Sequence, residues 1–360
     1  MTRIHNFSAG PAVLPEPVVR ATQEALWDLN GSGLGLCECS HRSALFEDVL
    51  ASATQGLRSL LALSDDQEVL FLPGGAQTQF YQIPMNLLRG GRATYLDTGV
   101  WSEGAMREAH RYGTVDVGYS SAPVYPNVPQ PGDVGELPTG TRYLHYTSNN
   151  TVAGTQFHHI PQVPAGVWRI CDMSSDIASR PVDGAAFDLI YAGAQKNLGP
   201  SGLAIVVIRR ELLEHCDPDL PTMLRYGVQV KQTSMFNTPN TFGIYVVDQV
   251  CRWIQDQGGL SAIGARNSAQ ADRVYAAIDG SAFWQGKARL DSRSIMNVTF
   301  STGDAELDTR FVKQATAAGL SGLKGHRVVG GLRASLYNAQ TDAAVSALVD
   351  FMAEFERANG

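Results

Sequence analysis

The chain has 360 residues, with 28 Lys and Arg against 35 Asp and Glu, and a formal net charge of −7. Hydrophobic residues make up 44% and charged residues 18%, so the chain can bury enough apolar surface to offset the entropy of folding, and disorder is disfavoured. A mildly acidic chain lacks the basic face that binding to a nucleic-acid backbone requires, which argues against nucleic acid as a partner.

No membrane or secretory segment is expected. The longest aliphatic run, residues 203–208, is about six residues long, whereas roughly 20 are needed to span a bilayer. No apolar stretch follows the first residues, as a signal peptide would require. The five cysteines are an odd number and widely spread apart from Cys37 and Cys39, which suits a reducing cytoplasm. No second Cys or His pair stands at zinc-finger spacing from these two, so no metal site is expected.

Apolar runs alternate with helical patterns through most of the chain. Six runs have the length and composition of buried strands, at residues 68–72, 93–97, 141–146, 167–171, 187–192 and 203–208. Helical spacing of apolar residues occupies residues 43–63, 79–88 and 102–112. This alternation predicts a mainly parallel sheet covered on both faces, and ligands bind such sheets beyond the carboxyl ends of the strands. A Pro- and Gly-rich stretch, residues 120–140, is expected to be a surface loop.

The pattern changes after Gly258. A long helical pattern covers residues 260–278, and a last helix is expected over residues 341–356. Between them, two strands at residues 295–300 and 331–336 are separated by a helix at residues 304–318. The end of the chain is therefore expected to form an α/β subdomain of about 100 residues.

One lysine stands directly after a predicted strand. Residues 187–200, FDLIYAGAQKNLGP, pass from an apolar strand into a turn of small residues that presents Gln195 and Lys196. A lysine at the mouth of an α/β sheet can form a Schiff base with an aldehyde cofactor if its surroundings lower its pKa. The alternative is a solvated loop lysine. The strand before Lys196 and the small residues around it favour the functional interpretation.

An aspartate ends the preceding strand. Asp172 follows the strand at residues 167–171 and lies 24 positions before Lys196. A carboxylate there can keep the pyridine nitrogen of pyridoxal phosphate protonated, and a lysine with such an aspartate is the minimal requirement for that cofactor. Taken alone, Asp172 would be interpreted as a turn or helix-capping residue ahead of Ser174.

Pyridoxal phosphate also needs an anion site and a group over its ring. Residues 73–78, PGGAQT, follow a strand and precede a helical pattern, so backbone N–H groups at the start of a helix can approach a phosphate. The segment has neither the dinucleotide-binding glycine fingerprint nor a P-loop. Trp101 could stack on the ring, or could simply pack in the core.

Five motifs together resemble those of one known family. They are NFSAGP at residues 6–11, SHR at 40–42, AGAQKNLGP at 192–200, SMFNTP at 234–239 and KGHRVVGGLRAS at 324–335. In this order, from about residue 4 to the last helix, they are similar to the phosphoserine aminotransferase family of class V, fold type I pyridoxal-phosphate enzymes. The resemblance implies an α/β fold with a large domain over residues 16–258, which has a mainly parallel sheet flanked by helices. A small α/β domain would be formed by residues 1–15 and 259–360.

The same resemblance assigns cofactor roles to single positions. It implies that Lys196 binds the cofactor and that Asp172 pairs with the pyridine nitrogen. Trp101 would stack on the ring, and Thr151 would form a hydrogen bond with its phenolic oxygen. The phosphate would be held by Ala76, Gln77 and Gln195, and by Asn237 and Thr238 from the other subunit of a homodimer. Many members of the family have Arg where Gln77 stands, a departure that bears on cofactor affinity rather than on the chemistry.

Substrate recognition is argued from charge. Phosphoserine and glutamate each carry an α-carboxylate and a distal anion, so a site for both needs at least two cationic anchors. The candidate anchors are His41, Arg42, His326, Arg327 and Arg333. The resemblance implies that Arg333 binds the α-carboxylate, that the others bind the phosphate or γ-carboxylate, and that Ser8 adds a hydrogen bond. For each arginine the alternative is a surface ion pair.

The expected activity is amino transfer between O-phospho-L-serine or 3-phosphohydroxypyruvate and glutamate or 2-oxoglutarate in serine biosynthesis. Some members of the family also act on 4-phosphohydroxy-L-threonine in pyridoxine biosynthesis. A cysteine desulfurase would need a mobile cysteine late in the chain, yet none follows Cys251. An alanine– or serine–glyoxylate aminotransferase would not need the extra anchors, and a nucleotide-dependent dehydrogenase would need the missing glycine fingerprint. A cofactor-binding protein without catalysis stays open.

Overall fold

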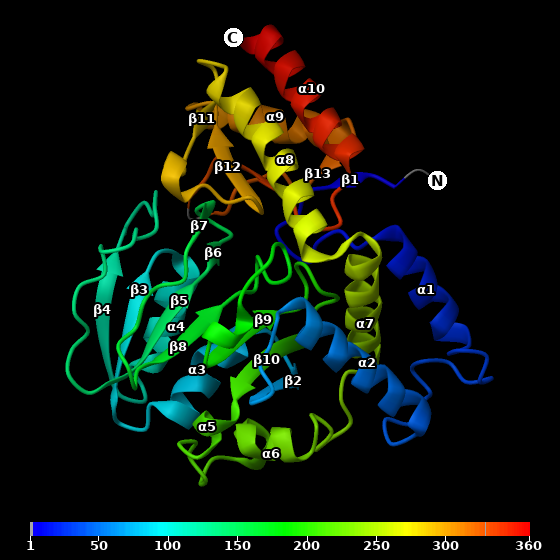
Figure 1. Ribbon diagram of the computed structural model, residues 1–360. Helices are drawn as coiled ribbons and strands as arrows, with labels where there is room; N and C mark the ends of the chain where they lie inside the picture. Colours follow the sequence, from blue (N-terminus) through cyan, green and yellow to red (C-terminus); the bar gives the residue numbers. More distant parts are fainter. Residues whose placement is uncertain (1–2, 328) are drawn as a thin grey trace.

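The computed structural model describes residues 3–327 and 329–360. Among these residues, the main sheet has seven strands in the order β2-β10-β9-β8-β5-β3-β4 (Figure 1). The strands are β2 (Gln67–Pro73), β3 (Arg92–Asp97), β4 (Thr114–Ser120), β5 (Thr141–Thr147), β8 (Trp168–Asp172), β9 (Leu189–Gly193) and β10 (Leu203–Arg209). Neighbours from β9 to β4 are parallel, and β10 is antiparallel to both β9 and β2. The predicted mainly parallel sheet is confirmed.

Helices cover both faces of this sheet because alternate side chains of each strand point to opposite sides. In β2, Phe71 belongs to the apolar core that includes α2 (Ala44–Leu60) and α7 (Thr241–Asp256), and Leu72 belongs to the core on α3 (Ala76–Leu87) and α4 (Val100–Ala109). Three further helices are α1 (Glu16–Trp27), α5 (Arg210–Leu213) and α6 (Tyr226–Lys231). The chain turns from β2 into α3 at Gly74, whose φ of 107° is unfavourable for other residues.

A second layer of structure lies above one end of this sheet in Figure 1. Within the described residues it is a three-stranded antiparallel sheet of β11 (Gln285–Gly286), β12 (Asn297–Ser301) and β14 (Leu332–Ser335). Beside it lie α8 (Gly259–Asp279), α9 (Ala305–Ala317), α10 (Asp342–Asn359) and the parallel pair β1 (His5–Asn6) and β13 (Leu320–Ser321). Its own apolar core unites Phe7 with Trp284, Phe311 and Phe355. A domain boundary at residues 16 and 258 stays a prediction.

All six strands predicted between residues 68 and 208 are present, and the helices expected near the end of the chain are α8, α9 and α10. The elements that were not predicted include the helices α1, α5 and α6 and the strand β4. Strand β4 lies at the edge of the sheet, and its residues are intermediate or exposed, so its sequence TVDVGYS carries too few apolar residues to signal a buried strand. Two shorter strands, β6 (Asn149–Asn150) and β7 (Thr155–Gln156), form a separate hairpin.

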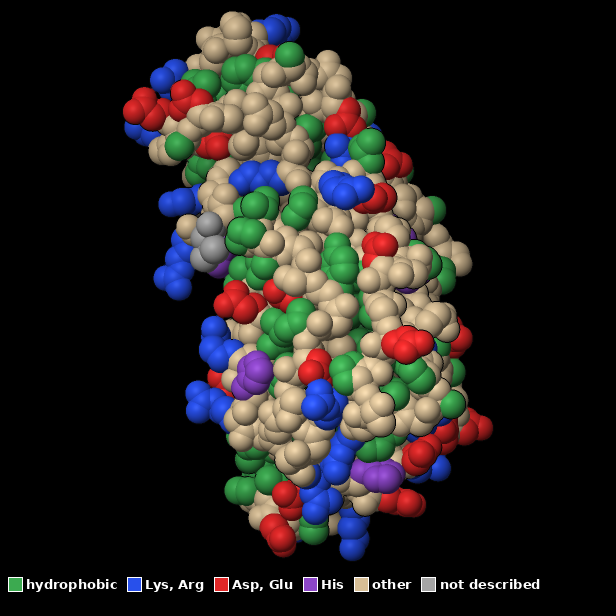
Figure 2. Space-filling view, turned by 90° about the vertical axis from the view of Figure 1, so that its left-hand side faces the viewer, with side chains coloured by type: hydrophobic (Ala, Val, Ile, Leu, Met, Phe, Trp, Pro, Cys, Tyr) green, Lys and Arg blue, Asp and Glu red, His purple; other side chains and the backbone are tan. Residues whose placement is uncertain are grey.

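The surface on the side of β4 carries acidic and basic side chains interspersed with apolar ones (Figure 2). This mixture agrees with the small net charge of the whole chain. None of the helices in the described part of the chain is both long and apolar enough to cross a bilayer.

Candidate functional site

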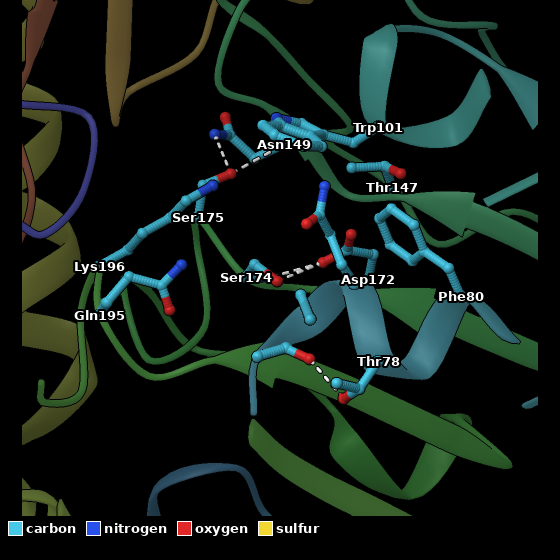
Figure 3. Close-up of a pocket in the computed structure, with 13 residues that line it drawn as sticks. Thr78, Phe80, Trp101, Thr147, Asn149, Asp172, Ser174, Ser175, Gln195 and Lys196 are labelled. Atoms are coloured by element: carbon cyan, nitrogen blue, oxygen red, sulfur yellow. Dashed lines mark hydrogen bonds between the residues drawn. The ribbon is translucent and has the colours of Figure 1, made fainter. Parts of the chain in front are cut away.

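A cavity of about 310 Å³ lies where the carboxyl ends of β5, β8 and β9 meet the first turn of α3 (Figure 3). Its lining contains six residues of the predicted cofactor site, namely Ala76, Gln77, Trp101, Asp172, Gln195 and Lys196. Thr147, Asn149, Ser174 and Ser175 also line it. The cavity therefore lies beyond the carboxyl ends of the strands, where the sequence predicts the site.

Lys196 reaches the cavity from the turn that follows β9. Its side chain is 9% exposed, and Nζ lies 2.6 Å from Thr151 Oγ1 and 6.0 Å from the centre of the Trp101 ring. Burial, together with the positive charge of Arg333, lowers the pKa of Lys196 to about 8. The Asp172 carboxylate opposes this change without cancelling it. At pH 7 roughly a tenth of Lys196 is therefore a neutral amine, far more than for an ordinary lysine, and a nucleophilic lysine reacts in this form.

The turn that carries Lys196 is held from several sides. The Gly193 N–H donates to Ser174 Oγ at 3.1 Å, and the Ala194 N–H donates to the Leu203 carbonyl at 3.0 Å. The next residue, Asn197, is buried and accepts a hydrogen bond from the Asn338 N–H at 3.0 Å. These contacts fix the lysine's backbone and leave its side chain directed into the cavity.

Asp172 lies at the end of β8 and is 3% exposed. Its Oδ1 accepts two hydrogen bonds from Ser174, from the backbone N–H at 2.9 Å and from the hydroxyl at 2.6 Å. Burial raises the pKa of Asp172, while these bonds and the charge of Lys196 oppose the rise. A cationic group that enters the cavity beside this carboxylate would stabilise its ionised form.

Two buried side-chain polar atoms of the cavity are available to form hydrogen bonds with a ligand. Thr147 Oγ1 and Trp101 Nε1 are buried, and neither has a hydrogen-bond partner among the residues that the structure describes. At the opposite end, Ala76 and Gln77 form the first turn of α3, where backbone N–H groups have no acceptor within the helix. An aromatic ring, a buried carboxylate, a buried lysine and a helix N-terminus therefore surround one cavity, and this set fits pyridoxal phosphate.

The predicted substrate residues divide into two groups. Arg333 lies on β14 close enough to Lys196 to lower its pKa, and Arg333 Nε is buried without a partner among the described residues. Burial and the charge of Arg333 lower the pKa of His326, so the two side chains are neighbours. Ser8 lies against Gly322, and its N–H donates to Asn6 Oδ1 at 2.9 Å. Lys287 Nζ donates to the carbonyls of Val329 and Gly330, in the loop that carries His326 and Arg327.

Besides Ser8, Thr151, His326, Arg327 and Arg333, four other predicted residues are absent from the lining of the cavity. His41 and Arg42 lie in the segment before α2, where Arg42 is exposed and its Nε lies 3.4 Å from His41 Nε2. Asn237 and Thr238 are exposed in the segment before α7. None of the four lines the cavity. Within the described residues, no group of three or more His, Cys, Asp and Glu side chains is arranged to hold a metal ion.

Sequence reasoning missed the polar wall of the cavity. Thr147 pairs with Asp172 across β5 and β8, so the two residues stand at the same level of the sheet. Following each predicted strand to its carboxyl end would have identified Thr147 in the same way as Asp172. Asn149, in the short strand β6, and Ser175 follow beyond these strand ends, and no local pattern marks them.

Comparison with known proteins agrees with this geometry. Residues 4–348 match the family of class-V aminotransferases. A phosphoserine aminotransferase of Desulfatibacillum aliphaticivorans is 48% identical over 362 residues, which cover 99% of each chain. The structure of phosphoserine aminotransferase from Bacillus circulans subsp. alkalophilus superposes with a TM-score of 0.97 at 46% identity and 99% coverage of both chains. A phosphoserine aminotransferase studied for radiation damage of its Schiff base also gives a TM-score of 0.97, at 43% identity, with 99% of this chain and 100% of that one covered. With a family match over nearly its whole length and full-length relatives at this identity, the chain belongs to the class-V aminotransferases and, within them, to the phosphoserine aminotransferase family.

Proposed function

We propose that this chain is a pyridoxal-phosphate-dependent phosphoserine aminotransferase. It would transfer an amino group between O-phospho-L-serine or 3-phosphohydroxypyruvate and glutamate or 2-oxoglutarate. The observation that carries the proposal is a buried lysine with a pKa of about 8, Lys196, in one cavity with the buried carboxylate Asp172. Family membership supports the same activity.

The residues of the site would hold the cofactor at four points. Asp172 would face the pyridine nitrogen, Trp101 would cover one face of the ring, and Thr151, which Lys196 already contacts, would bind the phenolic oxygen. The phosphate would lie at the first turn of α3, bound by Ala76, Gln77 and Gln195. When bound, the cofactor supplies an electron sink for the electrons released at the substrate's α-carbon.

Lys196 would have two tasks in the reaction. Its neutral amine first holds the cofactor, and it then takes the proton from the substrate's α-carbon at Nζ and returns it on the cofactor side. A pKa of about 8 suits both tasks, because a base works best when its pKa lies near the working pH. The Thr151 hydroxyl, 2.6 Å from Nζ, would orient the amine between these steps.

The substrate would be held by its two anionic ends. Arg333, whose buried Nε has no hydrogen-bond partner within the described part of the chain, would bind the α-carboxylate. The distal phosphate or γ-carboxylate would meet the other cations, His41, Arg42, His326 and Arg327, with a hydrogen bond from Ser8. Asn237 and Thr238 are exposed, and we propose that they reach the cofactor phosphate of a second subunit in a homodimer. A cytoplasmic location stays a prediction from the cysteine pattern.

Purified protein can test this proposal directly. With cofactor added, it should be yellow, and borohydride should fix the cofactor permanently on the peptide that contains Lys196, as mass spectrometry would detect. The same preparation should transfer the amino group of phosphoserine to 2-oxoglutarate, whereas Lys196→Ala should lose both the colour and the turnover. Colour without turnover would identify a binding protein instead of an enzyme. Comparing kcat/KM for phosphoserine and 4-phosphohydroxy-L-threonine would decide whether the second acid is also a substrate.

A further inference from the structure

A buried polar network connects the cavity wall to the strand that carries Arg333. The Asn149 amide nitrogen donates to Ser175 Oγ at 2.8 Å and to Asn297 Oδ1 at 2.7 Å. The Asn297 amide nitrogen in turn donates to Ser335 Oγ at 3.0 Å and to the Tyr337 hydroxyl at 3.3 Å. These five side chains are at most 2% exposed. The network therefore joins the lining of the cavity to β12 and β14, which are far from it in sequence.

The hydrogen bonds of this network fix the orientation of each amide. Ser294 Oγ accepts the N–H groups of Met296 and Asn297, so its own proton must go to Asn149 Oδ1, which lies 2.5 Å away. Asn149 Oδ1 is thereby an acceptor, and its nitrogen must face Asn297 Oδ1. Flipping the Asn297 amide would set two NH₂ groups against each other. In both amides the oxygen accepts a hydrogen bond and both N–H groups donate one. A buried network in which every polar group is paired is rigid and holds a single geometry.

Each end of the network lies beside a different part of the proposed site. Asn149 and Ser175 line the cofactor cavity. Asn297 pairs with Ser335 across β12 and β14, two residues along the strand from Arg333. The Tyr337 hydroxyl donates to the Ala9 carbonyl at 2.8 Å, next to Ser8. Asn297 is thus the one side chain of this network that bonds both to the cavity wall and to the strand of Arg333.

We propose that Asn297 is a positioning residue that fixes the distance between the cofactor cavity and Arg333. This inference rests on the proposed function, in which the substrate's α-carboxylate binds Arg333 while its α-carbon faces Lys196. The paired hydrogen bonds between an arginine and a carboxylate tolerate little displacement, so a shift of Arg333 relative to the cavity would weaken binding of the substrate's α-carboxylate. Phosphoserine and glutamate both use the α-carboxylate, so the spacing matters equally for both.

The test compares Asn297→Ala with a matched variant elsewhere. Asn86, 0% exposed, also makes three hydrogen bonds through its amide, to the carbonyls of Gln82 and Leu224 and from the Tyr226 N–H. Asn86→Ala should therefore lower the melting temperature about as much as Asn297→Ala does. Asn297→Ala alone should raise KM for phosphoserine and for glutamate by the same factor, about tenfold or more, with a smaller effect on kcat. The absorbance of the bound cofactor and its dissociation constant should match those of the wild type.

A milder variant keeps the test decisive if Asn297→Ala does not fold. Ser335→Ala removes only one acceptor at the Arg333 end, and we expect it to raise both KM values about threefold. Unchanged KM values in a folded variant, a rise for one acid only, or a loss of cofactor affinity would each overturn the positioning role. A wild-type protein that does not transaminate would refute the proposed function itself, so the two failures are distinguishable.

Discussion

Replacing Lys196 by methionine should stabilise the cofactor-free protein near neutral pH. The pKa of Lys196 is about 8 in the folded chain and close to 10.5 in the unfolded chain. Below pH 8 both states bind the proton, and the folded state carries the full cost of burying the ammonium group. Between pH 8 and 10.5 only the unfolded chain binds it, so this contribution to stability rises with pH, and above 10.5 the cost disappears. Methionine has nearly the same length and never carries the charge.

The size of the effect follows from the same two pKa values. At 1.36 kcal/mol per pKa unit, lowering the pKa from 10.5 to about 8 costs the folded protein about 3 kcal/mol at pH 7. The variant also loses the hydrogen bond from Nζ to Thr151, which is worth about 1 kcal/mol. Lys196→Met should therefore raise the free energy of unfolding by about 2 kcal/mol at pH 7.

Urea unfolding of the cofactor-free proteins at pH 7 and pH 10 measures this difference. The gap between Lys196→Met and the wild type should fall by more than half at pH 10. Lys231 is exposed at the end of α6, and Lys231→Met serves as the control, with a change below about 0.5 kcal/mol at either pH. A variant less stable than the wild type at pH 7, or a gap that does not depend on pH, would refute the argument that Lys196 is held against a cost of burial.

Four further substitutions test the proposed roles. Asp172→Ala should retain covalent capture of the cofactor yet reduce turnover at least about a hundredfold. A spectroscopic titration of this variant should place the Lys196 pKa below about 8, because the Asp172 charge raises it in the wild type. Near-normal turnover would remove Asp172 from the mechanism. Arg333→Ala should raise KM for phosphoserine and glutamate about tenfold to a hundredfold in steady-state assays, and a normal KM would contradict its role as the carboxylate anchor. Arg42→Ala should also raise KM for both acids without changing the cofactor absorbance; unchanged KM values would exclude it from the site. Gln77→Arg should tighten cofactor binding up to about tenfold in titrations of the cofactor-free protein, and weaker binding would show that neutral donors suit this phosphate site better.

The sequence predicted the catalytic end of the site because local pattern and position coincide there. Asp172 and Lys196 each follow a strand of apolar residues, and the carboxyl ends of parallel strands meet at one edge of the sheet. Six of the seven strands of the main sheet were predicted for a related reason, since buried strands carry continuous apolar runs. Strand β4 was missed because its residues are intermediate or exposed, so it has no need of such a run.

The polar wall of the cavity could not be predicted in this way. Asn149 and Asn297 are hydrogen-bonded across 148 positions of the chain, and a buried asparagine is indistinguishable in sequence from one in a surface turn. The resemblance to a family supplied roles for His41, Arg42, Asn237 and Thr238, yet this chain alone does not place them on the cavity. For Asn237 and Thr238 we propose a second subunit, which no periodicity within one chain can indicate.

The parallel pairing of β1 with β13 affects the order in which parts of the enzyme fold during synthesis. The cavity lining comes from residues 75–196, so its parts are synthesised early. The side that carries Arg333 is completed only when β13 meets β1 and Tyr337 reaches Ala9, 328 positions away. Contacts of such long separation form late, because the chain entropy of closing the loop must be lost first. On the ribosome, a nascent chain would therefore assemble the pocket that holds the cofactor before it could bind a substrate, and amino transfer would begin only after the C-terminus is released.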